Sequence, residues 1–183
     1  MASRHTSVIP ICLMGALLLD GCGVNGRVEQ GRVVAYDPQS NRLTLILETL
    51  PPRPVTITAP ADPAEIGPPP TAGGLLSLDY RNHRIAIYDR ATGSFETIAY
   101  RPLKERFHVA KAPKVPAVDP ARKTITIYDA ANHALITFAA TGDLLAMPAD
   151  TWRAGDIIRY YCKDPAHALR LMNVSKTDLS KSS

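Results

Sequence analysis

The chain has 183 residues, of which 45% are hydrophobic and 21% charged, and its formal net charge is +4. This length suits one domain of ordinary size, or two small ones, with enough chain for a real core. The mild basic excess favours attraction to anionic lipids or polysaccharides. It does not reach the density of a nucleic-acid footprint, so nucleic acid is excluded as a partner.

The first residues have the pattern of a cleaved export signal. Arg4 and His5 give a basic start, residues 8–19 form an almost uninterrupted apolar segment, and Gly21 then precedes Cys22. A transmembrane helix needs about 20 apolar residues, so this segment is too short to span a membrane. We therefore expect residues 1–21 to be removed on export.

The end of this segment, Leu19-Asp20-Gly21-Cys22, resembles a bacterial lipobox, in which the signal is cut after the small residue and the new N-terminal cysteine carries the lipids. The resemblance implies that Cys22 is the lipid attachment site and that Leu19 and Gly21 belong to the cleavage signal. Asp20 departs from the usual small or apolar residue. In such lipoproteins an aspartate after the cysteine commonly holds the protein at the inner membrane, so Gly23 points to the outer membrane, facing the periplasm. The alternative is an ordinary secreted protein with a coincidental cysteine.

Period-two alternation dominates the remaining chain and predicts an all-β fold. The Pro-rich stretch 51–70 is predicted to be an edge strand plus a stiff loop, because proline cannot donate to a strand ladder. The basic stretch 101–114, which prolines interrupt, is predicted to be a solvated connector rather than a polyanion-binding surface. The expected strands are 31–36, 42–47, 55–58, 75–78, 84–88, 94–99, 123–128, 134–139, 156–162 and 168–174.

Aspartates open the turns between these strands. An aspartate at the first turn position accepts hydrogen bonds from the backbone amides that follow it. In the turns without proline, Asn82, Gly93 and Asn132 are expected to take the left-handed conformation. Calcium binding is the alternative for these loops, although their oxygen atoms do not alternate as calcium ligands do. The six turn aspartates are Asp37, Asp79, Asp89, Asp119, Asp129 and Asp164.

An internal repeat with an offset of 40 residues aligns Asp79, Ile85 and Tyr88 with Asp119, Ile125 and Tyr128. The unit 85–93 resembles a β-propeller blade, and a period near 40 is typical of such blades. A closed propeller needs at least four blades, so unless the flanks are degenerate blades or the protein oligomerises, the fold must be smaller. The flanks 31–37 and 154–160 look like strands of small exported OB-like barrels. We predict antiparallel hairpin repeats that form a small barrel or sandwich; the alternative is two propeller-like blades plus flanking strands.

These patterns divide the chain into five segments. We expect a signal peptide, a lipid-anchored N-terminus with the first hairpin, a Pro-rich edge strand and loop, a hairpin-repeat body and a disordered tail. Their ranges are 1–21, 22–50, 51–74, 75–175 and 176–183.

No known catalytic motif occurs in the chain, so we predict no enzyme activity and no cofactor. Because Cys12 leaves with the signal and Cys22 carries lipid, Cys162 has no partner for an internal disulfide. Alternation places it on one strand face with Ile158 and Tyr160, so we expect a buried, inert thiol; a reactive or metal-binding thiol is the alternative. We predict no metal site. The alternatives are a histidine site, a soft copper site and a sugar-stacking surface. The histidine site would use His83, His108, His133 and His167, and the copper site would use Met147, Met172 and Trp152. The sugar-stacking surface would use Trp152, Tyr36, Tyr88, Tyr128, Tyr160 and Tyr161.

As a whole, the chain from residue 22 resembles small bacterial lipoproteins assigned only to domain-of-unknown-function families, such as those of sulfate-reducing bacteria. The resemblance rests on the lipobox, the length and the hairpin pattern, and it transfers only Cys22 as a functional residue. We expect a non-catalytic, membrane-anchored envelope lipoprotein that binds an envelope protein or polysaccharide. A small-ligand or metal-binding periplasmic module is the alternative.

Overall fold

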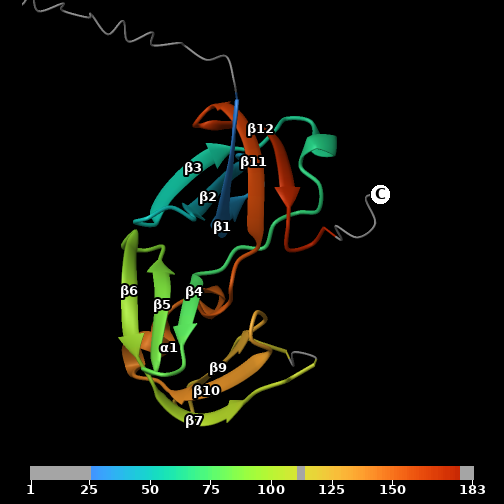
Figure 1. The fold of residues 1–183 in the computed structure, drawn as a ribbon. Coiled ribbons are helices and arrows are strands. Elements are labelled where there is room, and N and C mark those ends of the chain that lie inside the picture. Colours follow the sequence, from blue (N-terminus) through green and yellow to red (C-terminus); the bar gives the residue numbers. More distant parts are fainter. Residues whose placement is uncertain (1–25, 111–113, 178–183) are drawn as a thin grey trace, which may run out of the picture.

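The computed structural model describes residues 26–110 and 114–177. Figure 1 shows a barrel at one end of the molecule and a pair of sheets at the other end. The all-β prediction is confirmed, and each expected strand overlaps an observed one. The strands are β1 (Arg27–Asp37), β2 (Arg42–Leu47), β3 (Arg53–Thr58), β4 (Leu75–Asp79), β5 (Arg84–Asp89), β6 (Ser94–Ala99), β7 (Arg101–Arg106), β8 (Ala117–Asp119), β9 (Thr124–Asp129), β10 (Ala134–Ala139), β11 (Ile157–Asp164) and β12 (His167–Asn173).

Helical structure in the described ranges is short. It consists of two 3₁₀ turns, η1 (Pro63–Glu65) and η2 (Ala149–Trp152), and the helix α1 (Gly142–Ala146). Among the residues that the structure describes, no helix has the length and apolar character needed to cross a membrane.

The barrel is closed in the strand order β1-β11-β12-β3-β2. Both flanks that look like strands of small exported barrels lie in it, where β1 pairs with β11. The closing pair of β12 and β3 is parallel and meets at His167 and Thr58. Most of β3 therefore has no ladder on that side, which explains why Pro54 is tolerated there. The barrel core contains Val33, Leu43, Leu45, Leu47, Ile57, Ile158, Tyr160 and Cys162.

The chain between β3 and β11 forms a β-sandwich. One sheet has the order β4-β5-β6 and the other β7-β10-β9-β8. Apolar residues of both sheets and Trp152 of η2 share one core, so the two sheets pack face to face. Its fully buried members include Ile85, Ile87, Ile125, Ile127, Ile136, Phe138 and Trp152.

The internal repeat is visible in the sandwich. An offset of 40 residues carries the bounds of β5 onto those of β9 and the bounds of β6 onto those of β10. The backbone N–H of Tyr100 donates to His83 O, and the equivalent N–H of Ala140 donates to Lys123 O. Two copies bury their apolar faces against each other, so they form a sandwich rather than blades around an axis.

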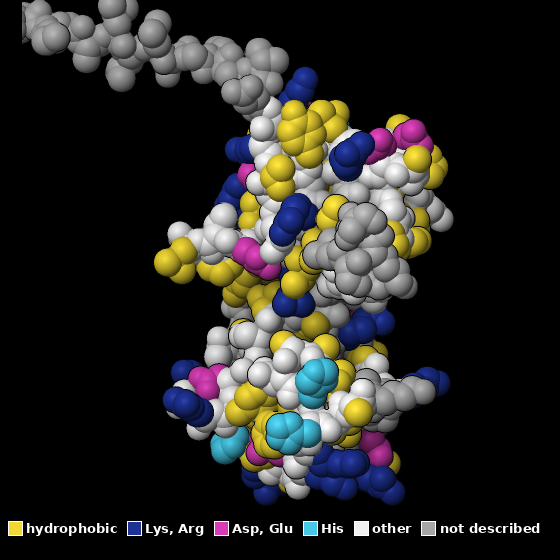
Figure 2. Space-filling view, turned by 45° about the vertical axis from the view of Figure 1, so that its right-hand side comes forward, with side chains coloured by type: hydrophobic (Ala, Val, Ile, Leu, Met, Phe, Trp, Pro, Cys, Tyr) yellow, Lys and Arg dark blue, Asp and Glu magenta, His cyan; other side chains and the backbone are white. Residues whose placement is uncertain are grey.

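The expectation of a solvated connector over 101–114 is wrong for its first half. Residues 101–106 form β7, which pairs antiparallel with β10. Hydrophobic alternation does not predict this strand, because it is an edge strand with mostly exposed side chains and it carries Pro102. In Figure 2, Lys and Arg side chains gather at the lower end of the molecule, where Figure 1 places β7.

The division of the strands between the barrel and the sandwich does not follow the expected segment boundaries. β11 and β12 fall within the expected body 75–175, yet they lie in the barrel with β1, β2 and β3. The expected tail 176–183 begins with ordered residues, because Lys176 Nζ bonds to Pro69 O and Thr177 Oγ1 to Asn173 O. Residues 178–183 lie outside the described ranges.

Candidate binding groove between the barrel and the sandwich

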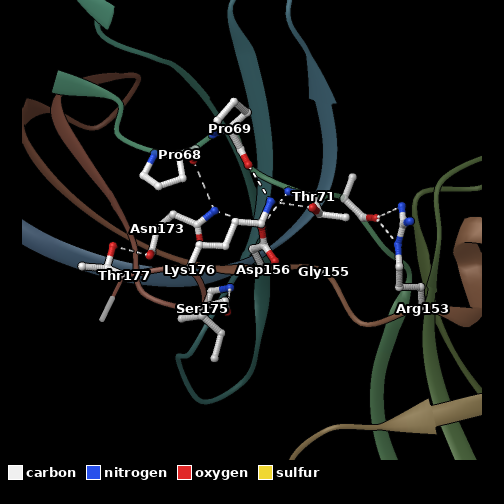
Figure 3. A network of polar contacts seen from close by, with 12 residues as sticks. Pro68, Pro69, Thr71, Arg153, Gly155, Asp156, Asn173, Ser175, Lys176 and Thr177 are labelled. Carbon is white, nitrogen blue, oxygen red and sulfur yellow. Dashed lines mark hydrogen bonds and ion pairs between the residues drawn. The ribbon is translucent and has the colours of Figure 1, made fainter. Parts of the chain in front are cut away.

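Two chain segments connect the barrel to the sandwich, one before β4 and one before β11. A polar network built around Asp156 holds them together (Figure 3). The Asp156 carboxylate accepts from Thr71 N at 2.7 Å and from Asn173 Nδ2 at 2.9 Å, and it lies 3.0 Å from Lys176 Nζ. Burial alone would raise the pKa of Asp156, but these contacts outweigh it and the pKa lies below its ordinary value.

The same segments touch β1 backbone to backbone. Gly73 N donates to Val33 O, and Val33 N donates to Asp156 O. A Cβ atom built on Gly155 would lie 1.8 Å from Val33 O, and one on Gly73 would lie 2.1 Å from Arg153 O. Glycine is required at both positions because only its missing side chain permits this approach.

A small apolar cluster adds a second contact between the bodies. The register of β1 and β2 shifts between Val33 and Ala35, which marks a bulge at Val34. Val34 packs with Ile46 on the barrel side and with Tyr88 and Leu76 on the sandwich side. The junction is therefore fixed by packing as well as by hydrogen bonds.

Beside this junction lies a groove with a volume of about 370 Å³. Four consecutive residues of β4, Leu75 to Leu78, form one wall, and the β9–β10 turn from Asp129 to Asn132 forms another. The barrel contributes Arg32 and Ile157, and Ala154 and Ser175 complete the lining. The groove is mostly apolar, with a cation on one side and an anion on another.

The charged groups of the groove are held in place. Asp129 accepts from Tyr80 Oη, from Asn132 Nδ2 at 2.7 Å and from Ala131 N at 3.0 Å. Burial raises the pKa of Asp129, but these hydrogen bonds outweigh it and the pKa is lowered overall. Burial and the neighbouring carboxylate raise the pKa of the Tyr80 phenol. At neutral pH Asp129 is ionised and Tyr80 is protonated, so Asp129 contributes a negative charge to the groove lining.

Residues 25–182 match the family described as a domain of unknown function, DUF4881. The chain belongs to this family. The expected resemblance to a domain-of-unknown-function family is thereby confirmed. No curated protein and no solved structure matches the chain.

The predicted lipobox residues of this DUF4881 chain, Leu19, Gly21 and Cys22, lie outside the described ranges. The structure therefore leaves the lipid anchor as a prediction. The first strand, β1, begins at Arg27. In Figure 1 this end of β1 is at the end of the barrel that points away from the sandwich.

The alternative metal residues of the DUF4881 chain are not brought together. Within the described ranges, no group of three or more His, Cys, Asp or Glu side chains is placed to hold a metal ion. His167 pairs instead with Asp164 across their turn, 2.6 Å between Nδ1 and Oδ2. Trp152 is fully buried in the sandwich core, Met147 packs against that core, and Met172 is exposed on a barrel strand. The copper set is thus split between two bodies.

The aromatic residues mostly serve the cores. Trp152, Tyr160 and Tyr88 are buried, so they offer no open ring face to a sugar. Tyr36, Tyr128 and Tyr161 are half-buried. Cys162 is buried in the barrel core with a free thiol, as expected.

The six turn aspartates form the turns that the sequence predicts. Each accepts a backbone N–H two or three residues further on, from Gln39, Arg81, Ala91, Arg122, Ala131 and Ala166 in chain order. The expected left-handed residues are only partly right. Gly93 has a positive φ, but His83 and His133 take this conformation in the other two turns. Asn82 and Asn132 bond through their side-chain amides to Asp79 and Asp129 instead.

The groove is not among the features that the sequence predicts. Its residues come from β1, β4, the β9–β10 turn and the segments flanking β11, which are far apart in the chain. They share no motif, and no pattern in the sequence could have found them.

Proposed function

We propose that this protein is a lipid-anchored, non-catalytic envelope protein that binds another envelope protein or a polysaccharide. The observation that carries the proposal is the export signal ending in Cys22, five residues before β1 begins at Arg27. A lipid at Cys22 would hold the barrel close to the membrane surface. The sandwich, at the other end of the molecule in Figure 1, would face the periplasm from the outer membrane.

The junction groove supports a binding role. Its apolar walls carry Arg32 and Asp129, so it offers one positive and one negative contact to an amphipathic chain segment. Pockets with apolar walls and few placed polar groups are typical of binding sites.

The experiment that tests the proposal is in-cell crosslinking of the wild type beside Cys22→Ala, followed by membrane fractionation and mass spectrometry. We expect the wild type in the membrane fraction with lipid on Cys22 and with a reproducible protein or glycan adduct, and we expect Cys22→Ala to lose all three. Cys12→Ala is the matched control, because Cys12 is removed with the signal. A wild type without lipid that fractionates like Cys22→Ala would contradict anchoring.

The groove volume favours a small amphipathic ligand as the second candidate function. The dye 1-anilinonaphthalene-8-sulfonate, an apolar anion, is a suitable probe for the Arg32 side. Ala131→Trp would fill the groove and should reduce dye binding at least about tenfold. Ala91→Trp is the control, since Ala91 is the repeat equivalent of Ala131 in the β5–β6 turn and does not line the groove. Equal binding by both variants would argue against a ligand site here.

A further inference from the structure

Strand β6 has one partner. It pairs antiparallel with β5 from Ser94 to Ala99, and no other strand of the described ranges pairs with its second edge. In Figure 1 this edge borders the open side of the sandwich. Tyr100 N donates to His83 O, so the alternation of an antiparallel pair turns the backbone groups of Phe95, Thr97 and Ala99 outward.

The internal repeat shows what covers the equivalent edge. Forty residues further along the chain, the equivalent edge of β10 is covered by β7, which pairs with it antiparallel. The register places Arg106 opposite Leu135, Lys104 opposite Thr137 and Arg101 opposite Ala139. These three residues of β10 are the repeat equivalents of Phe95, Thr97 and Ala99.

The chain after each copy explains why β6 lacks such a cover. After β6 the chain enters β7, which crosses to the other sheet, and after β10 it forms α1. The first copy of the repeat therefore gives its covering strand to the second copy and receives none.

The edges of β7 and β8 are protected in the usual ways. β7 carries Pro102 and three basic residues, and β8 has only three residues. The start of β4 is met by Ala154, which bridges to Gly74 and Leu75. β6 has the sequence SFETIA, in which Glu96 is the one charged residue and Lys, Arg and Pro are absent, and Phe95 on it is 45% exposed.

We propose that the free edge of β6 takes up an extended strand from an envelope protein, in the antiparallel manner of β7 on β10. That the partner is an envelope protein and not a second copy of this chain rests on the proposed function; the strand pairing does not. The position opposite Glu96 corresponds to Glu105 of β7, which lies opposite Ile136. A glutamate opposite Glu96 would repel it, so the partner strand carries a basic residue there and an apolar or long side chain opposite Phe95.

A second copy of this chain fits the edge less well. Antiparallel pairing of two β6 strands has a twofold axis across the strands, and in Figure 1 β6 runs along the line from the barrel to the far end of the sandwich. The two β1 starts would then point in opposite directions. Lipids at both Cys22 residues could not enter one membrane.

The test is amide hydrogen exchange by NMR on the chain from residue 22 with Cys22→Ala. The probe is a synthetic peptide of residues 101–106 carrying Glu105→Lys, at millimolar concentration. We expect saturable slowing of exchange, at least about tenfold, at Phe95, Thr97 and Ala99. Little change is expected at Glu96 and Ile98, whose amides face β5. The peptide with Glu105 retained should bind more weakly.

Thr97→Pro removes an outward N–H without breaking the β5 ladder and should abolish the slowing. Thr97→Val keeps the N–H and should retain it. If Thr97→Pro fails to fold, Phe95→Lys blocks the same edge by charge. Absence of slowing in the wild type overturns the proposal, and so does slowing that survives both blocking variants. Protection of these amides in a peptide-free dimer would assign the edge to a second copy. Because this chain carries no lipid, failure here leaves anchoring untouched, and failed fractionation leaves this result standing.

Discussion

Gly155 lies in the connecting segment before β11, where this segment packs against the backbone of β1. A Cβ atom there would lie 1.8 Å from Val33 O, whereas one on Gly142 would meet no atom within 4 Å. Backbone cannot yield as a flexible side chain can, so relief of the clash requires movement of β1 or of the connecting segment.

We therefore expect Gly155→Ala to lower the free energy of unfolding by about 2–4 kcal/mol. Gly142→Ala should be neutral or slightly stabilising, because Gly142 lies in α1 with open space around it. Urea unfolding of both variants measures the difference. Equal stability of the two would mean that β1 and the segment can separate at no cost.

Asp156 links stability to pH. Its pKa is lower in the folded protein than the ordinary value of 3.8. The stabilisation it provides is therefore fully present above that ordinary value and is lost as the pH falls through the lowered folded pKa.

Asp156→Asn should cost about 1–3 kcal/mol at pH 7, because Lys176 and the buried Asn173 lose a charged partner. The cost should shrink as the pH falls below 3.8, because the unfolded chain gains a proton there first and the folded carboxyl follows at its lowered pKa. Urea unfolding at pH 7 and pH 3 measures both values, with the exposed Asp143→Asn as control. A cost that does not change with pH would show that charge is not the cause.

The two copies of the internal repeat contribute equivalent strands to one sandwich core. Ile85 on β5 and Ile125 on β9 are repeat equivalents, and both are fully buried in the shared sandwich core. Each faces the other sheet, so the two copies bury their apolar side chains in the same interior.

Ile85→Ala and Ile125→Ala should each lower the free energy of unfolding by about 2–5 kcal/mol. The two losses should agree within the range expected for equivalent cavities. Thr97→Ala, on the outer face of β6, is the control and should cost much less. If one isoleucine tolerates the change, the two sheets do not share one cooperative core.

Alternation predicts the paired strands of the repeat well because each has one face in the core. It misses β7 and β8, since the first is an exposed edge strand and the second has three residues. Turn chemistry is predicted from aspartate, but the left-handed residue is not always Asn or Gly. His83, His133 and Lys123 take that conformation because the ladder on either side fixes the loop length.

For the whole molecule, the sandwich is an insertion between β3 and β11, and both of its connections pass through the barrel junction. The barrel closes only when β11 returns to β1. Ile46 faces outward from the barrel and belongs to the junction cluster with Val34 and Tyr88, not to the barrel core.

Ile46→Ser should weaken the coupling of the two bodies. Trp152 fluorescence reports the sandwich, since Trp152 is the single tryptophan, and thiol labelling of Cys162 reports the barrel. We expect coincident unfolding curves for the wild type with Cys22→Ala and separate curves once Ile46→Ser is added. Thr44→Ala, on the same strand and outside the junction cluster, is the control and should leave the curves coincident. Coincident curves for Ile46→Ser would show that the polar network alone couples the bodies.

The sequence by itself determined the all-β class, most strands, the six aspartate turns and the repeat, because alternation, turn chemistry and periodicity are local properties. Only the tertiary structure decided that β1 pairs with β11, that the two repeat copies form one sandwich and that a groove lies between them. These features join residues that are far apart in the chain, 40 positions for the repeat copies and more than a hundred for Arg32 and Ile157. The free edge of β6 is also decided by the tertiary structure, because whether a strand is an edge depends on which strands pair beside it.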